Sequence, residues 1–214
     1  MSNTGRFADR TDAGERLATE LVDRGVDADL VLAIPRGGLP LGRAVAEALD
    51  APLDIVVASK IGAPGNPEYA VGAVASDGHV WLDDDAIARL SVDDGYVERE
   101  RERELRAARE KASRYRGDRA PPDLTGKTVV VVDDGVATGS TATAALRLVR
   151  EGGAERVVLA VPVGPPDTMS DLDAVADEVV VLRTPASFGA VGAFYDRFDQ
   201  VTDEEAMAYL DDTR

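Results

Sequence analysis

The sequence of 214 residues has no cysteine, only three lysines and one histidine, and aromatic residues make up 5% of it. Without cysteine, disulfide bonds and thiolate metal sites are excluded. The one histidine, His79, lies in a predicted strand, which favours a structural or surface role over catalysis. No apolar run approaches the ~18 residues of a membrane span, and the N-terminus lacks the apolar core of a signal peptide. We therefore expect a cytoplasmic protein.

Positive charge is also scarce: the sequence has 40 acidic and 24 basic residues, for a net charge of -16. Such a surface disfavours general binding of nucleic acids or anionic membranes. The preference for arginine over lysine, together with the excess of acids, is typical of halophilic proteins, which work at a Debye length of roughly 3 Å in 1 M salt. An anionic substrate would need local positive charge at its site.

Strands and helices alternate along most of the chain, which predicts a parallel sheet covered by helices on both faces. Ligands of such sheets bind at the carboxyl ends of the strands. The length predicts one large domain or one domain with a small appendage, and we expect a single domain over residues 1–214. Predicted strands span 30–34, 53–58, 128–132, 156–161 and 178–182, predicted helices include 12–21 and a segment ending at 49, and 71–75 and 79–82 are predicted to form a hairpin.

The clearest chemical signal is the stretch from Thr128 to Thr141. Its four consecutive valines predict a strand that is buried on both faces. Small and hydroxyl residues then begin a helix, whose free amides can bind phosphate. The adjacent Asp133 and Asp134 fit a ligand that also carries a sugar diol or a divalent metal. Because neighbouring strand residues point to opposite faces, both acids reach one ligand only if the strand is already turning at Asp134.

This stretch resembles the phosphoribosyl pyrophosphate (PRPP) signature of the type I phosphoribosyltransferases. The resemblance implies that Asp133 and Asp134 bind the ribose hydroxyls. It implies a doubly wound α/β fold with a mainly parallel sheet and a small hood. Over its whole length the chain resembles the uncharacterised "predicted phosphoribosyltransferase" group. Hypoxanthine–guanine members carry an acid where this chain has Ala137, which argues against assigning the proton-transfer role of that acid to this position. The residues implied for the 5′-phosphate are Ala137, Thr138, Gly139, Ser140 and Thr141.

Two further segments carry candidate site residues. Arg36, Gly37 and Gly38 follow a predicted strand, where glycines allow close backbone approach and arginine can neutralise an anion; the resemblance implies that they bind pyrophosphate. Lys60 is predicted to end a strand before a Gly/Pro-rich loop at 61–67. Family members close a flexible loop here over PRPP, so the resemblance implies that Lys60 contacts pyrophosphate. Glu68 could assist the incoming base or be a solvated hairpin residue.

Two segments are predicted to lie outside the parallel sheet. An inserted charged helix spans about 91–116, with a thin apolar stripe that packs on the domain or on another subunit, as in a homodimer. The candidate hood comprises 183–214 and the N-terminal helix. A capping box at Thr202 starts its final helix. Its aromatic residues Phe188, Phe194 and Tyr195 could stack a heterocycle or form the core of a subdomain.

The resemblance implies Mg²⁺-dependent transfer of the 5-phosphoribosyl group from PRPP to a nitrogenous base or related acceptor, with release of pyrophosphate, in nucleotide metabolism. The interpretation assigns Asp133, Asp134, Arg36 and Lys60 to catalysis. It assigns no residue as a metal ligand, because Mg²⁺ would be bound mainly through PRPP. The partners are small molecules, with no nucleic acid or membrane. The alternative is a regulatory protein that senses PRPP or a nucleotide in the same pocket without turnover.

Overall fold

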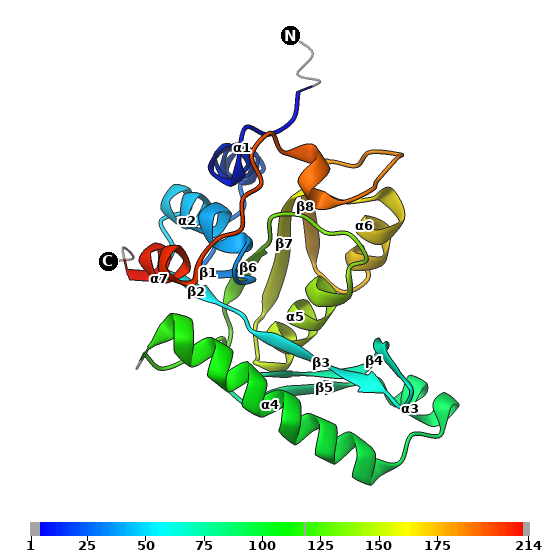
Figure 1. The fold of residues 1–214 in the computed structure, drawn as a ribbon. Coiled ribbons are helices and arrows are strands. Elements are labelled where there is room, and N and C mark those ends of the chain that lie inside the picture. The colour runs from blue at the N-terminus through cyan, green and yellow to red at the C-terminus, as the bar shows by residue number, and fades with distance from the viewer. Residues whose placement is uncertain (1–4, 118, 212–214) are drawn as a thin grey trace.

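The computed structural model describes residues 5–117 and 119–211, which fold into a central layer of strands with helices around it and a second, smaller group of strands (Figure 1). The elements of the central layers are α1 (Arg10–Asp23), β1 (Leu30–Ala33), α2 (Gly38–Ala48), β2 (Leu53–Ile55), β6 (Thr128–Val132), α5 (Ser140–Glu151), β7 (Arg156–Val163), α6 (Pro166–Asp173) and β8 (Glu178–Arg183). The remaining elements are β3 (Ala58–Ala63), β4 (Asn66–Ala75), β5 (Val80–Leu82), α3 (Asp84–Leu90), α4 (Asp94–Arg116), a 3₁₀ turn (Val191–Phe194) and α7 (Asp203–Asp211).

The central sheet is parallel and confirms the predicted fold class. Within the described residues it has five strands in the order β2-β1-β6-β7-β8. The strand β6 lies in the middle, and all four valines from Val129 to Val132 are fully buried. A central strand covered on both faces has no place for polar residues, which explains the uninterrupted run.

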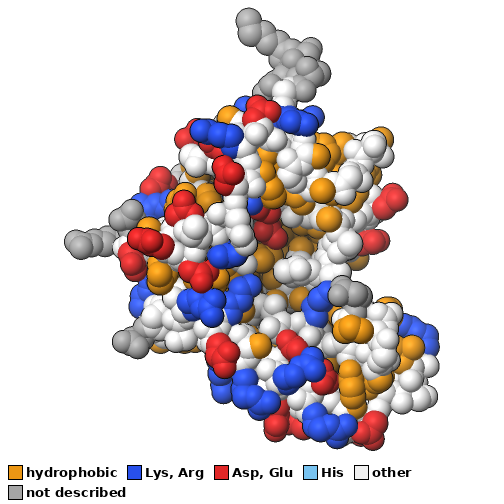
Figure 2. All heavy atoms as spheres, in the orientation of Figure 1, with side chains coloured by type: hydrophobic (Ala, Val, Ile, Leu, Met, Phe, Trp, Pro, Cys, Tyr) orange, Lys and Arg blue, Asp and Glu red, His pale blue; other side chains and the backbone are white. Residues whose placement is uncertain are grey.

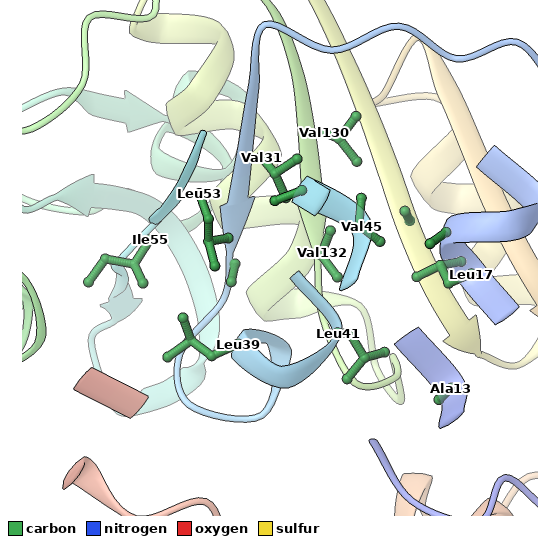
Figure 3. Packing of buried hydrophobic residues seen from close by; sticks show 14 of the residues in the cluster. Ala13, Leu17, Val31, Leu39, Leu41, Val45, Leu53, Ile55, Val130 and Val132 are labelled. Carbon is green, nitrogen blue, oxygen red and sulfur yellow. The ribbon is translucent and has the colours of Figure 1, made fainter. Parts of the chain in front are cut away.

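Helices cover both faces of this sheet. On one face Val31, Val130 and Val132 pack with α2 residues Leu41 and Val45 and with α1 (Figure 3). On the other face the alternate strand residues pack against α5 and α6. The alternation follows from the two-residue repeat of a strand, and it leaves the carboxyl ends of β1 and β6 side by side, paired Ala33 to Val132.

The strands β3, β4 and β5 form a separate antiparallel sheet, which corrects two predictions. The expected single strand 53–58 ends at Ile55, and the chain crosses to the second sheet through the buried Val56 and Val57. The expected irregular loop 61–67 is mostly a β3–β4 hairpin that turns at Pro64 and Gly65, with register shifts that accommodate the glycines and prolines. Lys60 therefore lies within β3, opposite Ala73, and does not end a strand.

The charged helix α4 packs on its own chain through a narrow apolar face. Val97, Ala108, Ala112 and Tyr115 are buried, whereas arginine and glutamate pairs such as Arg101–Glu98 lie on its exposed side. The hairpin of β4 and β5 forms as predicted. In the described part of the chain, no helix is long and apolar enough to cross a bilayer.

The segments at the two ends of the described chain lie together. The Phe7 amide donates to the Phe194 carbonyl (2.8 Å), and the Asp196 amide donates to the Phe7 carbonyl (2.8 Å). The rings of Phe7 and Tyr195 are 5.4 Å apart. The capping box is present, because Thr202 and Glu205 exchange hydrogen bonds at the start of α7. Residues 212–214 of the candidate hood lie outside the described residues.

Candidate active site

The acid pair lies directly beyond the end of β6. The strand ends at Val132, so Asp133 and Asp134 are in the turn and the condition for both to face one ligand is met. The Asp134 amide donates to Asp133 Oδ1 (2.8 Å). Arg10 Nε donates to Asp134 Oδ2 at 2.8 Å, with the two side chains only 12% and 14% exposed. One carboxylate of the pair is therefore held by an arginine from the first turn of α1.

Burial strongly perturbs these two carboxyls. It raises the pKa of Asp133 well above the ordinary value, and the neighbouring charge of Asp134 raises it further, against smaller opposing effects of Arg10 and Lys111. Burial also raises the pKa of Asp134, against the opposing ion pair with Arg10. Two carboxylates this close in a poorly solvated turn are stabilised by a ligand that donates hydrogen bonds or carries positive charge. Ribose hydroxyls and Mg²⁺ both meet that description.

The turn after β1 touches the acid pair. A Cβ atom added to Gly37 would lie 2.1 Å from Asp134 Oδ2, and one added to Gly38 would lie 2.5 Å from the Val132 carbonyl oxygen. A side chain at either position would force the two loops apart. The peptide bond between Pro35 and Arg36 is cis. The structure thus brings together two segments that the sequence separates by almost a hundred residues.

The segment from Ala137 to Thr141 forms the start of α5. Gly139 is the N-cap residue, with a left-handed φ of 78°, and glycine has no side-chain oxygen to cap the helix. Thr138 and Thr141 are exposed, and the hydroxyls of Thr138 and Ser140 lie 3.1 Å apart. Uncapped amides at the positive end of a helix dipole form a site for an anion.

Positive charge comes from Arg36, which the motifs indicated, and from residues that they did not indicate. Arg36 Nη1 donates to Asp203 Oδ1 in α7 (3.1 Å). Lys111 Nζ, from α4, donates to the Pro35 carbonyl (3.3 Å). Packing around the ammonium group, and the charge of Arg36, lower the pKa of Lys111. Sequence reasoning missed Lys111 and Arg10; the scarcity of lysine was a signal for Lys111, but it was used for Lys60.

The structure also decides one role among the aromatic residues. The Tyr195 hydroxyl donates to the Asp134 carbonyl (2.6 Å), and its ring is 2% exposed, so Tyr195 belongs to the core that supports the site. Phe188 and Phe194 are half-buried and stack on each other, 5.2 Å between centroids. Lys60 lies on the second sheet, and its place at the site stays a prediction. The side chain of Glu68 is outside the described part of the structure.

The donor set suits a metal that is bound through its substrate. In the described part of the chain, no three Asp, Glu, His or Cys side chains are arranged as a metal site. Magnesium commonly uses one or two carboxylates and completes its octahedron with water and phosphate oxygens. Asp133 and Asp134 fit that limited role.

Comparisons with known proteins show the family of this chain. The family model described as "Phosphoribosyl transferase domain" matches residues 6–195, so the chain belongs to the phosphoribosyl transferase domain family. Two curated proteins from Mycobacterium tuberculosis strains CDC 1551 and H37Rv, provisionally named as phosphoribosyl transferases, are each 45% identical over 205 residues. These matches cover 96% of this chain and 46% of each relative, so the chain spans about half their length. The crystal structure of TT1426 from Thermus thermophilus is 46% identical, with a TM-score of 0.89 over 96% of this chain and 97% of that one.

Proposed function

We propose that this protein transfers the 5-phosphoribosyl group of PRPP to a nitrogenous base or related acceptor and releases pyrophosphate, with Mg²⁺ bound mainly through PRPP. The observation that carries the proposal is the direct contact between the turn after β1 and the turn after β6, seen at Gly37 and Asp134. This contact places the anion-binding candidates Arg36, Gly37 and Gly38 beside the acid pair. A sugar that carries phosphate at one end and pyrophosphate at the other suits this pair of turns.

Each segment has a distinct part in the proposed reaction. Asp133 and Asp134 accept hydrogen bonds from the ribose hydroxyls and favour the positive charge that develops on the ring. The segment Ala137–Thr141 binds the 5′-phosphate. The loop at Arg36 stabilises the negative charge on departing pyrophosphate, as preorganised donors do. Magnesium would screen the same charge.

Other assignments belong to the same proposal. We assign Lys60, on the β3–β4 hairpin, to contact with pyrophosphate in a closed form of the site. We assign residues 183–214 with α1 to a hood over the acceptor, within a single domain over 1–214. We place the protein in cytoplasmic nucleotide metabolism, with small molecules as its partners and a homodimer as its assembly.

The rival function is a PRPP or nucleotide sensor that uses the same site without turnover. The test is to measure pyrophosphate release from PRPP and Mg²⁺ with a panel of purines, pyrimidines and related heterocycles. Release with one acceptor supports the transferase. Tight PRPP binding with no release across the panel supports the sensor.

A pair of variants tests the site independently of the acceptor. We expect Asp133→Asn with Asp134→Asn to weaken PRPP binding by at least tenfold, because neutral amides lose charge-assisted hydrogen bonds to the ribose. The control is Asp171→Asn with Asp173→Asn, which removes the same charge from exposed positions of α6. Calorimetric binding of PRPP that is equal in both double variants would refute the site assignment.

A further inference from the structure

Basic side chains from two distant parts of the chain surround one acidic residue of α7. Asp203 Oδ1 accepts hydrogen bonds from Arg36 Nη1 (3.1 Å) and from the Tyr115 hydroxyl (2.9 Å), and Oδ2 accepts one from Arg114 Nη1 (3.2 Å). Lys111 lies one turn before Tyr115 on α4 and contacts the Pro35 carbonyl next to Arg36. Figure 2 shows basic side chains gathered where the C-terminal end of α4 meets α7.

This arrangement brings two positive charges together, and an anion would reduce their repulsion. Arg36 and Lys111 are close enough for the charge of Arg36 to lower the pKa of Lys111. Two cations beside one another in partly desolvated surroundings repel, and a shared counterion removes the penalty. The carboxylate of Asp203 is shared by Arg36 and Arg114, while Lys111 donates to the neutral carbonyl of Pro35. The charges of Asp133 and Asp203 act on Lys111 as well, but desolvation and Arg36 outweigh them in lowering its pKa. The cluster thus has charge available for a further anion.

The nature of the anion follows from the donors and from the position. A guanidinium fork and an ammonium group bind phosphate oxygens with short charge-assisted bonds. The cluster adjoins the turn Arg36–Gly38, which touches the acid pair through Gly37. An anion held here lies beside the proposed ribose, where the pyrophosphate group of PRPP would be.

We propose that Lys111 binds the pyrophosphate group together with Arg36, and that Asp203 is an internal competitor for the same cations. The inference rests on the proposed function, since it assigns Lys111 of α4 and Asp203, at the first turn of the hood helix α7, to the pyrophosphate end of the PRPP site. Asp203 is about one-third exposed, and ion pairs at such positions are weak. A multiply charged phosphate group therefore outcompetes the carboxylate, while the carboxylate lowers its affinity.

The experiment measures calorimetric binding of inorganic pyrophosphate with Mg²⁺ to the full chain. We expect Lys111→Gln to weaken binding by about tenfold, in line with the loss of one charge-assisted contact. Glutamine removes the charge and keeps a hydrogen-bond donor on a side chain that is one bond shorter. Lys111→Arg is expected to restore most of the affinity. Lys127→Gln, at the opposite end of β6, is the matched control and is expected to bind as the wild type does.

The second arm tests the competition. We expect Asp203→Asn to tighten pyrophosphate binding by about three- to tenfold, because a nearby negative charge is removed. Glu204→Gln removes the same charge from the next, exposed position of α7 and is expected to change binding by less than about twofold. Thermal melting of each variant shows that it is folded.

The outcomes separate this inference from the proposed function. Pyrophosphate binding that depends on Lys111, without any transfer from PRPP, supports the inference and counts against the transferase. Transfer activity with Lys111→Gln binding pyrophosphate like the wild type overturns the inference alone. Absence of pyrophosphate binding by the wild-type protein, or an Asp203→Asn effect no larger than that of Glu204→Gln, also overturns it.

Discussion

Replacing Arg10 by methionine is expected to destabilise the protein substantially, because it leaves a poorly solvated carboxylate without its partner. Arg10 Nε donates to Asp134 Oδ2 at 2.8 Å, with both side chains less than 15% exposed. Its Nη1 also donates to the Asp199 carbonyl. The guanidinium lies 3.8 Å from the centroid of the Phe198 ring. Methionine keeps an apolar stem of similar length and removes all of these polar contacts.

The magnitude follows from these contacts. A hydrogen bond to a charged group contributes about 1.5–3 kcal/mol, and the cation–π contact contributes about 0.5–1 kcal/mol. We expect Arg10→Met to lower the free energy of unfolding by about 2–4 kcal/mol at pH 7. This is near the lower end of the about 3–5 kcal/mol measured for breaking fully buried pairs, because Asp134 keeps some solvent contact.

The loss of stability in Arg10→Met should depend on pH. Burial raises the pKa of Asp134 even with Arg10 present, and removal of the arginine raises it further. A carboxyl whose folded pKa is raised contributes stability that is complete below its unfolded pKa and is lost as the pH rises through the folded pKa. The deficit of Arg10→Met should therefore be smaller near pH 4, where only the contacts with Asp199 and Phe198 are lost, and should grow toward pH 7.

The assay is urea unfolding with linear extrapolation at both pH values. Arg24→Met is the control, since Arg24, the C-cap residue of α1, forms an exposed pair with Glu20 of that helix. Its loss should cost less than about 1 kcal/mol. The double variant with Asp134→Asn should be more stable than the sum of the single changes predicts, because no unpaired charge remains. A deficit of Arg10→Met equal to that of Arg24→Met, or independent of pH, would refute the reasoning.

Further predictions concern the same site and the surface. Asp133→Asn should raise the free energy of unfolding by about 1–2 kcal/mol at pH 7 and by little near pH 4, because burial raises the pKa of Asp133; urea unfolding at the two pH values checks this, and a loss of stability at pH 7 would contradict it. Tyr195→Phe should lose about 1 kcal/mol with its hydrogen bond to the Asp134 carbonyl, and an unchanged melting temperature would exclude that contribution. Gly37→Ala should cost about 1–3 kcal/mol and weaken PRPP binding, since its Cβ would overlap Asp134 Oδ2, whereas Gly189→Ala, which points into open space, should do neither; equal calorimetric and melting results for the two would count against the contact. If the excess of acids is a halophilic trait, the melting temperature should rise between low and 1 M salt as charge repulsion is screened, and a flat response would reject that hypothesis.

The parallel sheet could be predicted because its signals are local. Consecutive valines in β6 and apolar runs in β1, β7 and β8 reflect strands that are buried on both faces. The order of acids, small residues and helix start after β6 likewise follows from a few neighbouring positions. These short stretches indicated both the fold class and the carboxyl edge where the proposed site lies.

The second sheet could not be predicted in the same way. The apolar run 53–58 has the composition of one strand, yet Val56 and Val57 are buried in the crossing between two sheets. Burial gives such a crossing the same composition as a strand. The turn residues at 61–67 marked a real turn at Pro64 and Gly65, but backbone pairing with β4 extends the strands almost to it.

By itself the sequence determined the part of the proposed site that would hold the ribose and the 5′-phosphate: a buried strand, two acids beyond it, and the uncapped start of α5. Only the tertiary structure decided which charges meet there. Arg10 lies 124 residues from Asp134, Arg36 lies 167 residues from Asp203, and Lys111 lies 76 residues from Pro35. Strand burial and helix starts leave a periodic or local trace in the chain, because neighbouring residues share one backbone geometry. An ion pair between distant segments leaves none, because it depends on how α1, α4 and α7 pack around the sheet.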